Sequence, residues 1–196
     1  MDILSELGLG ANSFSNLYID PKLLIDSRPY LVYLRKSRKD ASLGDLTDEE
    51  ILAKHKATLL ELCRTLKIPM PEENIRYEIG SGDTIQDRPV FQQVLKELEN
   101  NMWAGIIIVE IERLGRGDSM DQGRILQAIK YSKSRVITPY KMYYPYISTE
   151  DEEDLECDLN KSRVEYRRIK RRLQNGRIQA VKDGKYPFGN PPLGLN

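Results

Sequence analysis

The residues of this chain that could do chemistry are one serine and four arginines, all placed beside apolar runs or loops. Ser37 and Arg35 end a short apolar run, and Arg88 follows a glycine-rich loop. Arg113 and Arg116 follow a second apolar run. A serine hydroxyl attacks a phosphodiester when its proton is removed and the developing charge is stabilised. Arginine suits the second task because its planar guanidinium binds phosphate oxygens bidentately and keeps its charge near neutral pH. These residue types point to metal-independent displacement at a phosphodiester.

Two carboxylates and a tyrosine accompany this set. Glu78 precedes the glycine-rich loop, Glu112 precedes Arg113, and Tyr33 lies in the first apolar run. The carboxylates could orient the arginines, help to move the serine proton, or do both. Each member also has a plain structural alternative, since Ser37 could cap the next segment and Tyr33 could be a core residue. The joint arrangement, and not any single member, favours the chemical interpretation.

Apolar runs suited to buried strands alternate with amphipathic segments in the first three quarters of the chain. A capping box at Thr47-x-x-Glu50 and a proline at position 89 mark helix starts. This alternation predicts an α/β fold with a mainly parallel sheet flanked by helices. The predicted strands are 30–34, 74–79, 104–111 and 135–138, and the predicted helices run from Thr47 to about Leu66, from Pro89 to about Asn101, and from Ser119 as the cap to Tyr131.

In such sheets ligands gather beyond the carboxyl ends of the strands. Ser37 follows the first predicted strand, Glu78 and the Gly80-Ser81-Gly82 loop follow the second, and Glu112 and Arg113 follow the third. Three segments that are distant in sequence therefore converge on one edge of the sheet.

Beyond residue 149 the sequence predicts one long helix with opposite charge in its two halves. Residues 150–158 hold seven acids, whereas residues 161–185 hold ten Lys or Arg against Glu165 and Asp183. Residues at alternating spacings of four and three predict a coiled-coil seam that pairs two subunits. The alternative is a lone solvated helix. The seam would be Leu155, Leu159, Ser162, Tyr166, Ile169, Leu173, Gly176 and Ala180. The residues expected to contact DNA phosphates are Arg163, Arg167, Lys170, Arg171 and Arg177.

The bulk composition is that of an ordinary globular protein. Of 196 residues, 40% are hydrophobic and 31% charged, and the formal net charge is zero, so any nucleic-acid contact must come from a local basic patch. No stretch approaches the ~18 apolar residues of a membrane span. Cys63 and Cys157 show no ligand or disulfide spacing, which favours reduced thiols in a cytosolic protein.

Four parts are expected along the chain: an N-terminal extension (1–29), a catalytic domain (30–149), the long helix (150–185) and the start of a linker to a further domain (186–196).

Three ordered motifs make the chain resemble the catalytic domain of the serine recombinases, the resolvase/invertase family, and especially the large serine integrases. They are Tyr33-Leu34-Arg35-Lys36-Ser37, Glu78-Ile79-Gly80-Ser81-Gly82-Asp83 with Asp87-Arg88-Pro89-Val90-Phe91, and Glu112-Arg113-Leu114-Gly115-Arg116-Gly117-Asp118. Gly184-Lys185-x-Pro187-Phe188-Gly189 with Leu193-Gly194 resembles the junction to the DNA-binding domains of a large integrase.

The resemblance implies a role for each matching residue. Ser37 matches the nucleophile, which forms a 5′-phosphoserine link and leaves a 3′-hydroxyl. Tyr33 matches a tyrosine that supports the site. The family also implies double-stranded DNA attachment sites as substrate, a homodimer that assembles into a synaptic tetramer, no cofactor or metal, and a location in the cytoplasm of a bacterial host. The arginines that match those binding the phosphate are Arg35, Arg88, Arg113 and Arg116.

The resemblance is not complete. Glu78 and Glu112 stand where small resolvases carry aspartate, and the helix after Ser37 offers His55 and Lys56 where many relatives have a glutamine.

Two other functions stay open on the sequence alone. One is a metal-dependent nuclease that uses Glu78, Asp83, Asp87 and Glu112. The other is a binding and assembly module in which the catalytic residues no longer act. Tyrosine recombination fits poorly, because that chemistry uses an Arg-His-Arg set and the single histidine is His55.

Overall fold

The computed structural model describes residues 26–36, 47–79, 84–115 and 118–186. Two of the residues assigned to catalysis, Ser37 and Arg116, lie outside the described residues, as does the loop at 80–83. The segments 1–25 and 187–196 lie outside them as well.

The centre of the molecule is a five-stranded sheet in the order β2-β1-β3-β4-β5. The first four strands run parallel, and β5 pairs with β4 antiparallel. The predicted mainly parallel sheet is therefore confirmed, and β5 is an addition that the sequence did not predict. The strands are β1 (Tyr30–Lys36), β2 (Ile75–Ile79), β3 (Gly105–Ile107), β4 (Arg135–Ile137) and β5 (Met142–Tyr143).

The third strand ends earlier than predicted. The apolar run continues through Ile108 and Val109, but the strand ends at Ile107. One more hydrogen bond to β4 follows, from the Ile108 amide to the Ile137 carbonyl oxygen at 2.9 Å, and the chain then forms a short 3-10 turn, Ile111–Arg113. Glu112 and Arg113 thus lie on a turn and not at the end of a strand. Apolar character alone shows burial and does not show where the strand's hydrogen bonds stop.

The helices begin and end close to the predicted positions. At the start of the first described helix, Thr47 accepts a hydrogen bond from the Glu50 amide, and Glu50 bonds back to the Thr47 amide, so the capping box is formed. The predicted cap at Ser119 is wrong, because the Asp118 carboxylate accepts from two backbone amides and Ser119 is the first helical residue. The helices are α2 (Asp48–Thr65), α3 (Pro89–Glu99), α4 (Ser119–Tyr131) and α5 (Thr149–Lys182).

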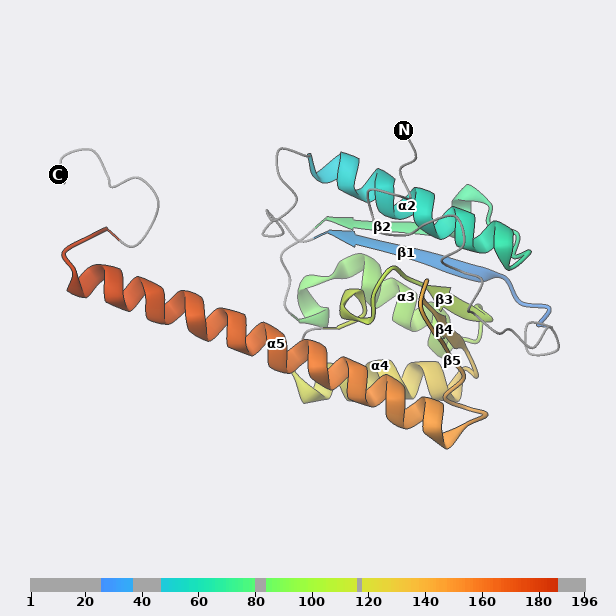
Figure 1. The fold of residues 1–196 in the computed structure, drawn as a ribbon. Coiled ribbons are helices and arrows are strands. Elements are labelled where there is room, and N and C mark those ends of the chain that lie inside the picture. The colour runs from blue at the N-terminus through green and yellow to red at the C-terminus, as the bar shows by residue number, and fades with distance from the viewer. Residues whose placement is uncertain (1–25, 37–46, 80–83, 116–117, 187–196) are drawn as a thin grey trace.

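The sheet separates two apolar layers (Figure 1). Helix α2 covers one face, and α3, α4 and the first part of α5 cover the other. Alternate side chains of β1 pack in the two layers. Leu31 and Tyr33 belong to the cluster with α3, α4 and α5, and Val32 and Leu34 belong to the cluster with α2. The side-chain period of the strand therefore decides which helices each β1 residue meets.

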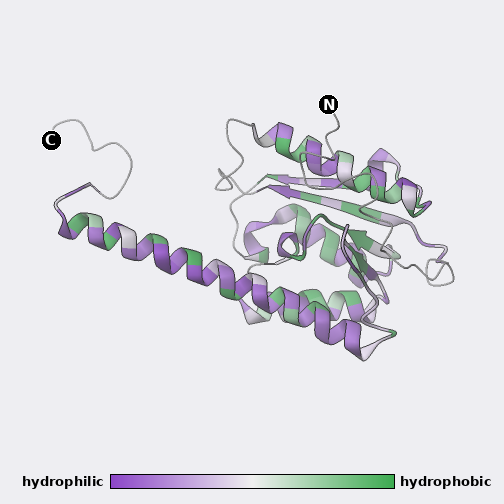
Figure 2. Ribbon diagram, in the orientation of Figure 1, coloured by the Kyte–Doolittle hydropathy of each residue, from purple (hydrophilic) through white to green (hydrophobic). Residues whose placement is uncertain are grey.

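Helix α5 has two parts that differ in what they contact. Leu155, Leu159 and Ser162 are buried against the body. Beyond them the helix projects away from the body (Figure 1) and is largely hydrophilic (Figure 2), with Ile169 and Leu173 exposed. The long helix is confirmed. The first three positions of the predicted inter-subunit seam, however, pack inside their own subunit.

The acidic start of α5 bonds to the body of the same subunit. Four of its carboxylates contact cationic, hydroxyl or amide groups of α4 and the β4–β5 region, and Gln122 of α4 donates to the Leu159 carbonyl oxygen at 2.6 Å. The carboxylate contacts are Asp151 with the Tyr144 amide (3.0 Å), Glu152 with Lys130 (2.7 Å), Asp154 with Lys141, and Asp158 with the Tyr143 hydroxyl (2.8 Å).

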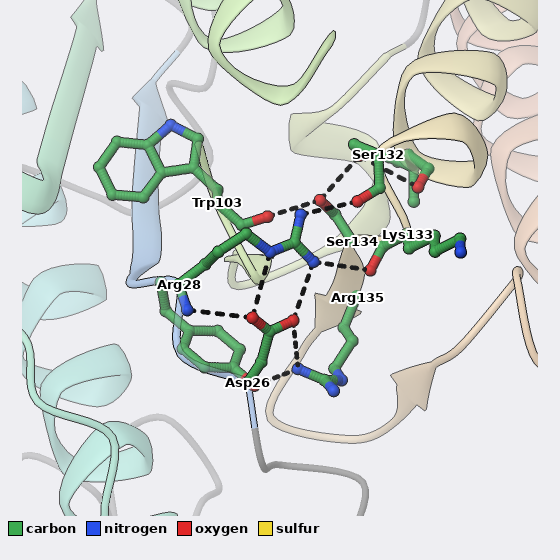
Figure 3. A network of polar contacts seen from close by, with 9 residues as sticks. Asp26, Arg28, Trp103, Ser132, Lys133, Ser134 and Arg135 are labelled. Carbon is green, nitrogen blue, oxygen red and sulfur yellow. Dashed lines mark hydrogen bonds and ion pairs between the residues drawn. The ribbon is translucent and has the colours of Figure 1, made fainter. Parts of the chain in front are cut away.

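A polar network lies at the amino ends of β1, β3 and β4 (Figure 3). The Asp26 carboxylate binds the Arg28 guanidinium, with Oδ2 2.8 Å from Nη2, and lies 3.7 Å from Nη1 of Arg135. Arg28 also donates to the carbonyl oxygens of Ser132 (2.7 Å) and Lys133 (3.2 Å). The end of the predicted N-terminal extension is thereby fixed to the loop between α4 and β4.

Candidate active site

The first strand supplies the residues that come directly before Ser37. Tyr33 and Arg35 share one face of β1, because they are two residues apart on a strand. That face meets α3, since Tyr33 belongs to the same apolar cluster as Phe91. Arg35 is 4% exposed and pairs in register with Glu78 of the neighbouring parallel strand. The described part of β1 ends at Lys36, one residue before the predicted nucleophile.

Glu78 connects β2 to the helix beyond it. Its carboxylate accepts the Tyr33 hydroxyl proton at Oε2 and the Val90 amide proton at Oε1, the latter at 3.1 Å. Val90 lies in the first turn of α3, where backbone amides lack partners within the helix and favour a negative charge. The Nε of Arg88 lies 3.4 Å from the same Oε2. Glu78 thus ties the edge of the sheet to the start of α3.

Tyr33 is held as a neutral hydroxyl in this network. Burial raises the pKa of Tyr33 well above its ordinary value, and the Arg88 guanidinium offsets only part of that effect. The hydroxyl donates to Glu78 and accepts from Nη2 of Arg88 at 2.9 Å. A tyrosine in this state orients its neighbours and is a poor source of protons near neutral pH.

Arg88 is enclosed by protein groups. Its side chain is 3% exposed, and its guanidinium lies 4.1 Å from the centre of the Phe91 ring. It donates to the carbonyl oxygen of Leu114 at 2.5 Å and to that of Arg113 at 2.6 Å, in addition to Tyr33 and Glu78. Arg88 therefore joins β1, β2 and the chain that follows the Ile111–Arg113 turn.

The turn itself carries Glu112 and Arg113, both partly buried. The Arg113 guanidinium pairs with the Glu110 carboxylate at 3.2 Å. Glu110 was not singled out in the sequence, although its place three residues before Arg113 is the spacing at which side chains meet on a helical turn. The turn also contacts α5, and a groove of about 280 Å³ opens between them, lined on its two sides by Glu112 and Asp158.

The structure therefore brings together most of the described residues that the sequence assigned to the site. Tyr33, Arg35, Glu78 and Arg88 surround the carboxyl end of β1, and Arg88 bonds directly to the turn that carries Arg113. Phe91, which lies under the Arg88 guanidinium, and Val90, whose amide binds Glu78, belong to the second sequence motif but had no predicted role. Their position just after a proline at a helix start was the available signal.

No group of three His, Cys, Asp or Glu side chains is arranged to hold a metal ion within the described ranges. Of the carboxylates that a metal-dependent nuclease would use, Asp83 lies outside the described residues. Asp87 accepts a hydrogen bond from the Thr84 hydroxyl at 2.8 Å. The helices in the described part of the chain include none that is both long and apolar enough to cross a membrane.

The basic residues of α5 do not all have the same surroundings. Arg163 lies where the helix leaves the body, and it bonds to the Ser119 hydroxyl and to the Asn160 side chain at 2.8 Å. Arg167, Arg171 and Arg177 are exposed on the projecting part. On a helical wheel Arg167 and Arg171 lie outside the stripe that the later seam positions occupy, whereas Arg177 borders it.

Comparison with known proteins reveals similarity over most of the chain. A family model described as the resolvase N-terminal domain matches residues 30–186. Among solved structures, the N-terminal catalytic domain of TP901-1 integrase superposes with a TM-score of 0.50 at 14% identity, covering 72% of this chain and 98% of that one. The C-terminal catalytic domain of ISC1926 TnpA, an IS607-like serine recombinase, gives a TM-score of 0.45 at 20% identity, covering 65% and 77%. The integrase match shows a shared fold.

Proposed function

The chain belongs to the family of resolvase N-terminal domains, the catalytic domains of serine recombinases, and we propose that it cuts and rejoins DNA through Ser37. The reaction would be site-specific integration or excision at double-stranded attachment sites in the cytoplasm of a bacterial host. The observation that carries the proposal is the gathering of Tyr33, Arg35 and Glu78 at the carboxyl end of β1, next in sequence to Ser37.

The proposed chemistry has two balanced steps. The Ser37 Oγ attacks the scissile phosphorus, so an Oγ–P bond forms and the P–O3′ bond breaks. The serine loses its proton, the departing 3′ oxygen gains one, and the DNA 5′ end stays attached as a phosphoserine. Attack by a 3′-hydroxyl after strand exchange reverses both changes and releases the serine.

The described residues supply positioning and charge for these steps. Arg35 and Arg113, with Arg116, would bind the non-bridging oxygens, because charge in phosphoryl transfer spreads over those oxygens. Glu112 lies on the same turn as Arg113 and would orient the arginines or take up the serine proton. Glu78 is already bonded to Tyr33 and the Val90 amide, which favours an orienting role.

The projecting part of α5 fits a role in both DNA contact and subunit pairing. About 20 residues separate the last buried position, Ser162, from the end of the helix, a length of about 30 Å. In Figure 1 it extends toward the side to which β1 and β2 point, the side of the candidate site. We propose that its exposed arginines contact phosphates and that Tyr166, Ile169 and Leu173 pair with a second copy, leading to a dimer and a synaptic tetramer.

Covalent trapping tests the reaction class. The protein is incubated in excess chelator with a duplex that carries its recombination site, nicked so that religation fails, beside the Ser37→Ala variant. We expect a DNA-linked protein band from the wild type alone. DNA cleavage that leaves no DNA-linked protein and that occurs only without chelator would indicate the metal-dependent nuclease. DNA binding without a band from either protein would indicate an assembly module.

A further inference from the structure

The sequence groups Arg88 with the phosphate-binding arginines, but its surroundings in the structure differ from that role. Four donations from its guanidinium go to protein groups: the Glu78 carboxylate, the Tyr33 hydroxyl, and the carbonyl oxygens of Arg113 and Leu114. A guanidinium has five N–H groups in all. Binding a phosphate bidentately would therefore require it to release at least one buried partner.

We propose that Arg88 is a positioning residue that holds the turn carrying Glu112 and Arg113 against β1 and β2, and that it does not bind the scissile phosphate. The proposal rests on the serine mechanism described above, because it assigns a role within that site.

The contacts explain why an arginine is needed here. The fork of the guanidinium reaches two successive carbonyl oxygens on one side and a hydroxyl and a carboxylate on the other, which a lysine ammonium cannot do at the same time. Its guanidinium carbon lies over the Phe91 ring, 4.1 Å from the centroid, and that ring packs against the Tyr33 ring with 5.1 Å between centroids. The guanidinium is thus hydrogen-bonded through its N–H groups and also in contact with an aromatic ring.

Burial makes the arrangement costly to open. Arg88 is 2% exposed and Glu78 is 5% exposed. Removing the guanidinium would leave a buried carboxylate without its cation and two carbonyl oxygens without their donors, and unpaired buried groups are strongly unfavourable. The turn would then be free to shift, and a misplacement of about 1 Å at a reacting group can reduce a rate about 10²-fold.

The experiment measures whether Arg88 interacts with the charge on the phosphate. Trapping rates are compared on two nicked duplexes, one natural and one with a neutral methylphosphonate at the scissile position. Each is reacted with wild type, Arg88→Lys and Arg113→Lys. One change alters the side chain and the other removes the phosphate charge. If their effects on the trapping rate do not add as free energies, the side chain and the phosphate interact directly.

We expect Arg88→Lys to slow trapping about 10²-fold on the natural duplex and by the same factor on the methylphosphonate duplex. Arg113→Lys should slow trapping on the natural duplex and slow it less on the methylphosphonate duplex. The proposal would be overturned if the slowing caused by Arg88→Lys were at least tenfold smaller on the methylphosphonate duplex than on the natural one. It would also be overturned if Arg88→Lys trapped both duplexes at the wild-type rate.

Two further variants keep the test decisive. Arg135→Lys changes another buried arginine, 4% exposed, at the opposite end of the sheet, and should lower thermal stability without slowing trapping. If Arg88→Lys does not fold, Tyr33→Phe removes one acceptor of Arg88 and should give a smaller slowing that is equal on both duplexes. Unequal slowing would contradict the proposal. Failure of the wild type to form an adduct on either duplex would instead overturn the serine mechanism.

Discussion

Two arginine networks lie at opposite ends of the parallel strands, one partly buried at the amino ends and one buried at the carboxyl ends. At the amino ends, Arg28 binds Asp26 and two carbonyl oxygens, and Arg135 donates to the Tyr30 hydroxyl at 2.7 Å. At the carboxyl ends, Arg88 binds a carboxylate, a hydroxyl and two carbonyl oxygens. The partner types are the same, although only one network lies at the end of β1 that Ser37 follows in sequence.

This similarity shows that a buried arginine is not by itself a catalytic one. The amino-end network fixes the chain before β1 to the loop after α4 (Figure 3), and Arg88 fixes a turn in the same manner. What distinguishes the carboxyl end is the presence of additional arginines beside carboxylates: Arg35 is in register with Glu78, and Arg113 pairs with Glu110. On our proposal for Arg88, fewer arginines are available to a phosphate than the sequence pattern indicates.

Of the substitutions at the two ends of the sheet, the one with the largest expected effect on the trapping rate removes an arginine proposed to bind the phosphate. Arg113→Ala should slow adduct formation by about 10²–10³, because one preorganised donor of charge stabilisation is lost. Its thermal stability should change little. Trapping kinetics and a thermal melt of the same preparation measure both effects. A loss of less than threefold in rate would remove Arg113 from the site.

The reverse pattern is expected at the amino end. Arg28→Ala leaves two carbonyl oxygens without their donor and removes the guanidinium that binds the Asp26 carboxylate, so the free energy of unfolding should fall by about 1–3 kcal/mol. The trapping rate at a temperature where the variant is folded should equal that of the wild type. Denaturant unfolding gives the first quantity. A slowed rate in a fully folded variant would mean that the two ends are coupled.

The pH dependence of stability sharpens the same contrast. The hydrogen bond from Arg28 lowers the pKa of Asp26 below its usual value, so the ionised carboxylate stabilises the folded state. This contribution is complete above the unfolded pKa of about 3.9 and is lost as pH falls through the lower folded value. Asp26→Asn should therefore be less stable than wild type at neutral pH, with the difference shrinking below about pH 4. A constant difference from pH 7 to pH 3 would contradict this assignment.

The smallest expected effect concerns an exposed arginine on the projecting part of α5. Arg167→Ala should weaken DNA binding at low salt and reduce the slope of log affinity against log salt by about 0.9, the value for one phosphate contact. Folding stability should be unaffected. Fluorescence anisotropy across a salt series measures the slope, and Glu165→Ala on the same stretch is the matched control. An unchanged slope for Arg167→Ala would place the DNA elsewhere.

Much of this fold could be predicted from local sequence signals. The apolar runs located four strands, and the capping box and Pro89 located two helix starts, because these signals depend on neighbouring residues. The cap of α4 was missed because Asp118 and Ser119 are adjacent and both are good capping residues, and only backbone geometry decides between them.

The features that the sequence could not show concern partners that are distant in sequence. Leu155 and Leu159 follow a spacing that suits a coiled coil and equally suits packing onto the same subunit, so the sequence could not show that the body covers them. In sequence Arg88 resembles the other arginines of the motifs. Its hydrogen bonds to the carbonyl oxygens of Arg113 and Leu114 depend on where the Ile111–Arg113 turn lies in the fold, which the sequence does not show. Residue type limits the possible chemistry, and tertiary contacts decide which group performs it.

The most direct test of the central claim is to identify the residue that becomes attached to DNA. The trapped adduct is digested with protease and nuclease, and the modified peptide is sequenced by mass spectrometry. The serine mechanism predicts a nucleotide joined through its 5′ phosphate to Ser37, with a free 3′-hydroxyl on the other DNA end. Attachment at another residue, or through a 3′ phosphate, would contradict it.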